Sequence, residues 1–484
     1  PTGLRRPGAP RHAMERWVVL NTDLLFFMLL AVGLGYAVLA ARNEPLRAPW
    51  REVAANRFAA AAAVVLMTYL GVALLDSLHF HPRLPVKDGV SAGYSNEIRS
   101  VLDVILSPLR TRTEHSYSAP FATHAFGKEL VELDDGSVVR TYPRLEYGGA
   151  HLASGDSKTL DIAARALRGM LTGLLLPVAG IGIAGGSGRA RGRVTGGAMS
   201  AVRYGLGIGR PVPLVTAWST VAAVAAAIGV LAELGPVYHV LGTDKVGNDV
   251  LYQAVKSIRT GLFIGTLTTL VMLPFAISLG VMAGYFRGWV DDAIQYLYTT
   301  LSSIPGVLLI AAAVLLLDAY MERNAEAFTS VTARADLKLL ALCAILGITS
   351  WTSLCRLLRG EVLKLREVEF VQAARALGVP SGRILSRHLV PNVMHIVMIT
   401  IVLEFSNLVL AEAVLSYINI GVDPTMESWG NMINGARLEL AREPVVWWSL
   451  LAAFLFMFVL VLAANLFADA VRDAFDPRLR TLGR

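Results

Sequence analysis

The sequence predicts an all-α polytopic membrane protein with about nine transmembrane helices and a small external α+β insertion. Of its 484 residues, 54% are hydrophobic and only 17% are charged, whereas a soluble domain carries about 25% charged residues. The apolar residues are gathered into long runs, which is typical of a polytopic membrane protein. A charge-balanced segment lies between two of these runs, and it predicts a small domain outside the membrane.

Nine apolar runs are long enough to cross a bilayer, which takes roughly 20 residues for about 30 Å of hydrocarbon. The predicted spans cover residues 24–41, 58–78, 166–186, 213–233, 261–284, 294–317, 337–357, 393–415 and 447–468. The first run could also be read as a signal peptide, because arginines precede it and small residues follow it. Its length and the Arg-rich segment after it favour an uncleaved span.

The charges of the loops predict which ends of the spans face the cytoplasm. Residues 356–392 hold seven basic and three acidic side chains, whereas loops 318–336 and 416–446 each hold two basic and four acidic ones. Because basic residues stay on the cytoplasmic side, the first loop and the C-terminus are predicted to be cytoplasmic and the other two loops external. Loop 188–212, with five arginines and no acid, is predicted to be cytoplasmic too. The first span has arginines on both sides, so its orientation stays open.

Residues 79–165 are predicted to form the external domain, because they hold ten basic and eleven acidic side chains and several turn signals. The run from Val131 to Val139 predicts a β-hairpin, since Asp135-Gly136 supplies the positive φ of a tight turn. Five of the nine histidines lie in this segment, at positions 79, 81, 115, 124 and 151. Their spacing lacks the short regular intervals of a zinc site, so we expect no metal.

Neither a catalytic site nor a nucleic-acid surface is predicted. The turn Gly185–Gly188 lacks the lysine of a phosphate-binding loop, and no nucleophile elbow or zinc-protease helix is present. The net charge of +7 comes from arginines between apolar spans, with no aromatic-interleaved basic face for nucleic acid. Cys343 and Cys355 share one apolar run and form no disulfide framework or metal motif. We therefore expect a protein without cofactors that is not an enzyme.

Residues 366–392 predict a helix–turn–helix segment between two spans. Val371, Ala374 and Leu377 share one helical face. Gly378 suits the left-handed position that ends a helix, and Pro380 prevents its continuation.

A second short helix is predicted after the turn, with Ser381 as its N-cap. Ile384, Leu385 and Leu389 are its apolar residues. Such a segment is either an ordinary amphipathic loop or a rigid element on which another protein docks.

This segment resembles the cytoplasmic EAA loop of binding-protein-dependent ABC importer permeases, in the form found in the dipeptide and oligopeptide branch. The residues at the pattern positions are Glu369, Gln372, Ala373, Ala374, Gly378 and Pro391. Gln372 stands where the general pattern has Glu. In that family the loop inserts into a groove of the ATPase subunit, so the resemblance implies that these residues dock on an ATPase.

The resemblance extends over roughly Leu241 to Arg480, about half of the chain. Residues 241–251, 283–291, 428–432 and 472–478 also look like stretches of the C-type member of the permease pair. The resemblance implies a bacterial inner-membrane permease for peptides with a six-span core. It also implies a homologous permease as heterodimer partner, two ATP-binding subunits and an external substrate-binding protein.

The predicted organisation combines this core with added segments. It comprises an N-terminal segment with an extra span (1–57), the first core helix (58–78), the external insertion (79–165), two additional spans with an Arg-rich loop (166–240) and the remaining permease core (241–484).

Three polar residues in the run 393–415 are candidates for the translocation path: Glu404, Asn407 and Glu412. A carboxylate inside the membrane costs about 2.5–3.5 kcal/mol, so it is expected to face a cavity or a partner. Glu412 also fits a paired or wet carboxylate near the external end. Pro274 and Pro305 are predicted to be packed kinks within spans.

A different class of function stays open beside the importer permease. A stand-alone channel or a proton-coupled carrier that uses Glu404 would need no ATPase. The substrate is open as well, because dipeptides, oligopeptides and nickel chelates share this type of permease.

Overall fold

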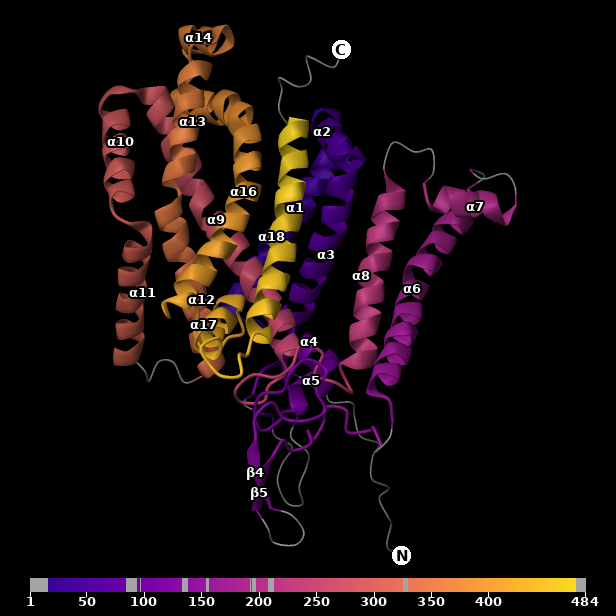
Figure 1. The fold of residues 1–484 in the computed structure, drawn as a ribbon. Helices are drawn as coiled ribbons and strands as arrows, with labels where there is room; N and C mark the ends of the chain where they lie inside the picture. The colour runs from indigo at the N-terminus through magenta and orange to yellow at the C-terminus, as the bar shows by residue number, and fades with distance from the viewer. Residues whose placement is uncertain are drawn as a thin grey trace, which may run out of the picture.

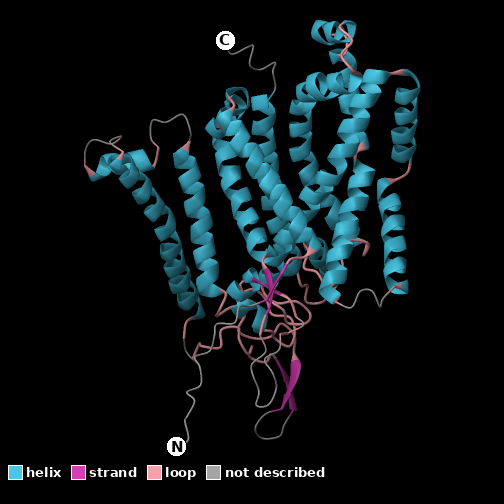
Figure 2. Cartoon of the chain, turned by 180° about the vertical axis from the view of Figure 1, so that it is seen from behind, coloured by secondary structure: helices cyan, strands magenta, loops and turns pink. Residues whose placement is uncertain are grey.

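The computed structural model describes residues 16–83, 94–95, 97–132, 138–153, 156–191, 193, 197–207, 213–324 and 330–475. Long helices run side by side, and the described part of segment 79–153 gathers at one end of them (Figure 1). We call this the insert end. The opposite end, from which residues 369–376 project, is the loop end. Seen from behind, the strands are confined to the insert end (Figure 2).

All nine predicted runs lie in helices, and eight of the spans in the described residues are long, apolar helices or continuous helical rods. Six are the single helices α1 (Asn21–Arg42), α3 (Arg57–Ser77), α6 (Lys158–Ala190), α8 (Leu214–Leu234), α9 (Val250–Phe286) and α18 (Trp448–Phe475). Two are composite, made of α12 (Val331–Ser350) with α13 (Thr352–Leu365), and of α15 (Ser381–Ile384), the π-helix η2 (Leu385–Leu389) and α16 (Val390–Tyr417).

The ninth predicted span, 294–317, is broken rather than straight. It is divided between α10 (Gly288–Ser303) and α11 (Gly306–Arg323), which meet at an angle of 85°. Ile304 is extended, with ψ 131°, as expected for the residue before a proline. The kink predicted at Pro305 is therefore confirmed, whereas α9 continues through Pro274 without a break. Neither proline is packed as predicted, because both are exposed in this chain.

Short elements occupy the two ends. At the loop end lie α2 (Glu44–Ala55), α7 (Ala198–Gly205) and α14 (Glu369–Ala376), and at the insert end lie α4 (Val101–Ile105), α5 (Ser107–Thr111) and α17 (Trp429–Glu439). The structure thus groups the loops as their charges predict. It also orients the first span, because α1 begins beside the insert and leads to α2 at the loop end.

Two small antiparallel sheets belong to the insert end. In the first, β1 (Arg16–Val18), β2 (His79–His81) and β3 (Arg99–Ser100) lie in that order, with Phe80 opposite both Trp17 and Arg99. The second is the predicted hairpin of β4 (Glu129–Glu132) and β5 (Val138–Thr141). The turn residues Asp135 and Gly136 lie outside the described residues.

Helix α9 is the centre of the bundle. It packs against α3, α10, α12, α13, α16, α17 and α18, and 22 of its 37 residues are buried. The added helices α6 and α8 pack mainly on each other. Glycines allow this close approach, since a Cβ on Gly169 or Gly173 would collide with the backbone of α8. The Gly-rich run of α6 is therefore an interhelical contact surface. Gly185–Gly188, expected to form a turn, instead belong to this helix.

Candidate functional site

The turn of the loop segment has the predicted backbone. Helix α14 ends at Ala376, and Gly378 has φ 73°. The N–H of Val379 donates to the carbonyl of Ala374 at 3.0 Å, which closes the end of the helix. A Cβ at Gly378 would meet no described atom within 4 Å, so the positive φ alone requires glycine here.

The second half of the segment differs from the prediction. Ser381 is the first helical residue and not the N-cap, because Pro380 occupies the cap position and its carbonyl already accepts the N–H groups of Arg383 and Ile384. The helix is also not short. It runs on into the membrane span, with the N–H of Val390 bonded to the carbonyl five residues earlier. A π-turn of this kind lets Pro391, which has no N–H, follow without ending the helix.

Apolar residues hold the base of the segment on the bundle. Val371, Ala374, Ile384 and Leu389 are buried in a cluster with residues of α9, α10, α13 and α16. Leu377, predicted to share the face of Val371 and Ala374, is instead 83% exposed. It follows the last turn of α14, so its side chain no longer keeps the helical direction.

The tip of the segment forms an exposed surface of mixed polar and apolar character, which we call the loop tip. It consists of Phe370, Gln372, Ala373, Arg375, Ala376, Leu377 and Gly378. Of the predicted docking residues, Gln372, Ala373 and Gly378 belong to it, and Glu369 is exposed beside it. Ala374 faces inward, and Pro391 lies beyond the π-helix.

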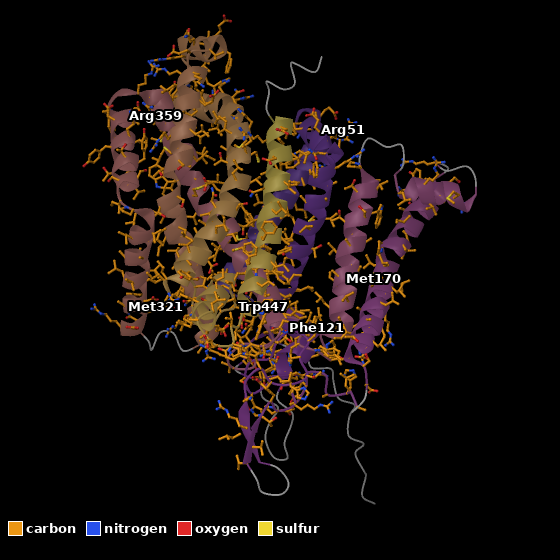
Figure 3. The ribbon with its side chains drawn as sticks, in the orientation of Figure 1. Arg51, Phe121, Met170, Met321, Arg359 and Trp447 are labelled. Carbon is orange, nitrogen blue, oxygen red and sulfur yellow. The ribbon has the colours of Figure 1, made fainter. Side chains whose placement is uncertain are left out.

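Two arginines, one in α13 and one directly after it, connect this region to the start of α10 and to the end of α9. The guanidinium of Arg359 makes two bonds to the Asp291 carboxylate, at 2.6 and 2.7 Å, and Figure 3 places Arg359 toward the loop end. Arg366 donates to the carbonyl of Tyr285 at 2.8 Å. The bidentate pair of Arg359 with Asp291 is geometrically specific. Sequence reasoning missed these pairings because their partners are about 70–80 residues apart.

The three path candidates of α16 lie in different environments. Glu404 is half-buried and Asn407 is exposed. Glu412 is 2% exposed, and the hydroxyl of Ser416 donates to its Oε1 at 2.6 Å. A Cβ on Gly430 would lie 2.8 Å from the same oxygen. Glu412 is thus packed against the start of α17, whereas Glu404 and Asn407 lie on an open side of this chain.

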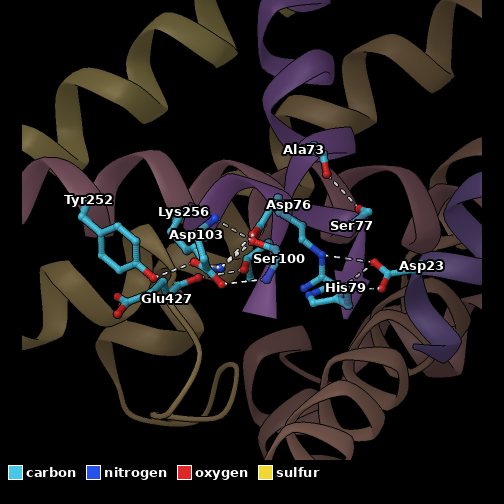
Figure 4. Close-up of polar contacts among 12 residues, drawn as sticks. Asp23, Ala73, Asp76, Ser77, His79, Ser100, Asp103, Tyr252, Lys256 and Glu427 are labelled. Atoms are coloured by element: carbon cyan, nitrogen blue, oxygen red, sulfur yellow. Dashed lines mark hydrogen bonds and ion pairs between the residues drawn. The ribbon is translucent and has the colours of Figure 1, made fainter. Parts of the chain in front are cut away.

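A polar cluster that the sequence did not reveal lies where the core meets the insert end (Figure 4). The ammonium of Lys256 on α9 contacts Asp76 at 2.8 Å and Asp103 at 2.5 Å. Tyr252 donates to Asp103 at 2.8 Å. Burial opposes ionisation of Asp103, but Lys256 and these hydrogen bonds together lower its pKa to about 2. The cluster joins the end of α3, helix α4 and the start of α9.

A second part of the cluster ties the added span α1 to the core. Asp23 accepts from Arg259 at 2.7 Å and contacts His79 at 2.9 Å. Asp336 of α12 accepts from the N–H of Asn21 at 3.0 Å. A pocket of ≈ 240 Å³ lies among these groups. Buried pairs of this kind depend on all partners being present.

A third polar contact, which we call the latch, joins the insert to the core. The buried ring of His239 lies between the carboxylates of Asp249, at 2.8 Å, and Glu114, at 3.2 Å. Burial disfavours the imidazolium, but the two carboxylates raise the pKa of His239 to about 9. Glu114 also accepts three backbone N–H groups of residues 146–148. Despite burial, these bonds and His239 lower the pKa of Glu114 to about 2.

The backbone reinforces this junction. The N–H of Ser118 donates to the hydroxyl of Thr243 at 2.7 Å, and the N–H of Thr243 donates to the carbonyl of Ser118 at 3.0 Å. Phe126 stacks edge-on against Trp448 at a centroid distance of 4.9 Å. Residues 114–126 therefore pack directly on the core.

The second half of the chain is similar to known membrane transport proteins. The family model "Binding-protein-dependent transport system inner membrane component" matches residues 276–481. The oligopeptide transport system permease protein OppC of Mycobacterium tuberculosis strain H37Rv is 32% identical over 246 residues, which are 51% of this chain and 78% of that protein.

Two further relatives match stretches of similar length. The glutathione transport system permease protein GsiD of Pectobacterium atrosepticum is 31% identical over 245 residues, or 50% of this chain and 74% of that protein. The dipeptide transport system permease protein DppC of Alkalihalophilus pseudofirmus is 31% identical over 243 residues, or 50% of this chain and 73% of that protein.

Proposed function

The chain belongs to the family of binding-protein-dependent transport system inner membrane components, and from this premise we propose that it forms half of a peptide translocation pathway and couples to ATPase subunits through its loop tip. Its relatives are non-catalytic permease subunits of ABC transporters, and this chain is a permease subunit of the same kind in the inner membrane. The named substrates of those relatives are oligopeptides, dipeptides and glutathione. Peptides are the substrate class that we propose for this chain.

One observation carries the coupling proposal: the loop tip is exposed while its base is buried. Gln372, Ala373 and Gly378 lie at a surface that offers polar, small and apolar side chains to a partner. Val371 and Leu389 anchor the same segment in the bundle, each with no more than 1% exposure. A displacement of the loop tip by a docked partner would therefore also displace its buried base. The continuous helix from Ser381 to Tyr417 would transmit this displacement into the membrane-spanning part of the chain.

The pathway proposal rests on the open side of α16. Glu404 and Asn407 would face the homologous permease, which completes the cavity between two such chains. Glu412 is buried and bonded to Ser416 in this structure. It could line the translocation path only if α17 moved away from its carboxylate. Alternating access then requires the two permeases to rearrange around this face.

Loop charges support the proposed orientation. The loop end carries the described arginines of 188–207 and those of 356–392, and the insert end carries the described parts of the acidic loops. Basic residues stay inside, so the loop end and the C-terminus are proposed to be cytoplasmic. The external substrate-binding protein would then approach the insert end.

Crosslinking tests the docking proposal. A cysteine at Ala373, in a background without Cys343 and Cys355, should crosslink to a co-expressed ATP-binding subunit. A cysteine at exposed Ala223 of α8 is the matched control and should not. Failure of the chain to co-purify with any ATP-binding subunit, together with loss of proton-driven uptake in Glu404→Gln, would contradict the proposal and favour the stand-alone carrier.

A further inference from the structure

An apolar groove opens between α3 and α8 in the loop-end half of the bundle. Its volume is ≈ 620 Å³, within the range of about 300–1,000 Å³ that small-molecule sites occupy. Ala63 lines one wall and Ala217 and Val221 line the other, while Phe467 of α18 forms its back and Trp50 of α2 covers its end. The groove is therefore bounded on several sides, unlike the open surface of a lipid-facing helix.

The groove exists because α8 joins the core mainly at the insert end. There Leu234 and Tyr238 are buried in a cluster with Leu109 and Leu251. Toward the loop end α8 stands apart from α3 in both ribbon views (Figures 1 and 2). The small side chains that face each other there leave the space unfilled.

Only an apolar occupant fits this space. The lining is almost entirely aliphatic and aromatic, and the hydroxyl of Thr68 already donates to the carbonyl of Val64 at 3.0 Å. A buried water needs 2–4 polar partners, which such a lining does not offer. Because α3, α8 and α18 are membrane spans, the bilayer supplies hydrocarbon directly to the opening.

Basic residues of α2 lie at the loop end, where Trp50 and Val53 of the same helix line the groove. The sequence around α2, residues 42–57, holds four arginines and two glutamates. Glu44 contacts Arg47 at 3.8 Å and Arg51 at 3.6 Å, and the segment as a whole keeps an excess of positive charge. Figure 3 shows Arg51 of α2 at this end of the bundle. Trp50, which covers the groove, is an aromatic residue suited to the membrane interface. A negatively charged headgroup is therefore favoured over a neutral one.

We propose that this groove holds one anionic phospholipid, with an acyl chain between α3 and α8 and its phosphate among the arginines of segment 42–57. The lipid fills the space between the core and the added helices and so holds α6 and α8 against the permease. This site is separate from the loop tip and from α16, and it does not depend on the transported substrate.

Native mass spectrometry on the full chain, purified with the subunits that accompany it, tests the proposal. The protein is exchanged into vesicles of phosphatidylglycerol or of phosphatidylcholine, and the lipid that stays bound after delipidation is counted. We expect one retained phosphatidylglycerol. Ala217→Phe and Ala63→Phe, which fill the groove from opposite walls, should each abolish retention. Ala223→Phe, on an exposed face of the same helix α8, is the matched control and should retain the lipid.

The headgroup is tested separately. Arg51→Gln and Arg57→Gln should each weaken phosphatidylglycerol binding by about fivefold, the size expected for one basic residue near an anionic surface. Arg140→Gln, at the insert end, should change nothing. Equal retention of phosphatidylcholine would overturn the anionic assignment. Retention unchanged in both filling variants, or no retained lipid in the assembled complex, would overturn the site itself.

Discussion

At the residue scale, the latch shows how a single buried histidine joins two parts of the chain. His239 belongs to the segment before α9, and Glu114 lies 125 residues earlier in the insert. The folded pKa of His239 is raised from 6.5 to about 9, so its stabilisation is complete below pH 6.5 and is lost as the pH rises through about 9. The folded pKa of Glu114 is lowered from 4.5 to about 2, so its stabilisation is present above pH 4.5 and is lost as the pH falls toward 2.

We expect the latch to stabilise the protein most between pH 4.5 and 6.5. His239→Gln should reduce the stability at pH 6.5 by about 3–5 kcal/mol, the cost of breaking a buried ion pair, and should flatten the decline toward pH 9. Buried Cys343 and Cys355 report unfolding through a thiol-reactive dye. The exposed His124→Gln is the control. An unchanged pH profile in His239→Gln would mean that the latch does not contribute to stability.

Gly378 makes a separate prediction at this scale. Gly378→Val forces a β-branched residue to φ 73°, which costs at least about 1–2 kcal/mol and should reorient the loop tip. The protein should still insert into the membrane, while the association with the ATP-binding subunit and uptake are reduced. Gly382→Val is the matched control, because Gly382 is exposed and helical with no described atom within 4 Å of its Cβ position. Normal uptake by Gly378→Val would contradict docking through this loop.

At the scale of elements, the insert consists of a part packed on the core and a part that projects from it. The part packed on the core is residues 114–126. It supplies Glu114 of the latch and Ser118, which bonds to Thr243. The β4–β5 hairpin instead extends away from the bundle (Figure 1), with Leu130 74% exposed and Val138 60% exposed. Removal of the whole insert would therefore leave His239 without Glu114, whereas removal of the hairpin would not.

Replacing residues 130–140 with a short Gly/Ser turn should leave the rest of the protein intact. Glu129 and Thr141 are paired neighbours, about 5 Å apart in such a ladder, so a two-residue turn can connect them. We expect unchanged thermal stability and ATPase association but weaker docking of the external substrate-binding protein in a pull-down. Replacement of residues 110–150 is the contrast and should destabilise the protein. Unchanged docking without the hairpin would assign the binding-protein surface elsewhere.

At the scale of the whole molecule, the two ends of the bundle have different compositions. The loop tip, α2 and α7 lie at one end, and the insert and α17 lie at the other (Figure 1). From the positive-inside rule we propose that the first end faces the cytoplasm. The added helices α1, α6 and α8 preserve this assignment, because α1 enters from the insert end and α6 and α8 form a hairpin that returns there.

Cysteine labelling checks this orientation. In a background without Cys343 and Cys355, a cysteine at Leu130 should react with an impermeant thiol reagent that is applied outside the cell. A cysteine at Met199 of α7, which is 73% exposed, should react only after the membrane is permeabilised. The reversed pattern would overturn the proposed orientation of every span.

The sequence by itself determined the features that depend on neighbouring residues. Hydropathy located all nine apolar runs, and the loop charges predicted which loops lie at the same end of the bundle. Gly378 and Pro305 predicted a turn and a kink through their own backbone preferences. The prediction for Ser381 was wrong because the next helix starts at Ser381 itself, so that Pro380 is the N-cap. The prediction for Leu377 was wrong because α14 ends at Ala376, so that Leu377 no longer follows the helical direction.

Only the tertiary structure decided which distant groups meet. The pairing of Lys256 with Asp103 spans 153 residues, and that of His239 with Glu114 spans 125. Nothing in the local pattern selects such partners, because each carboxylate by itself suits a solvated loop. Packing around α9 brings them together and removes the water, and this burial makes each charge depend on its partner. The groove between α3 and α8 has the same origin, since it depends on where two helices do not touch.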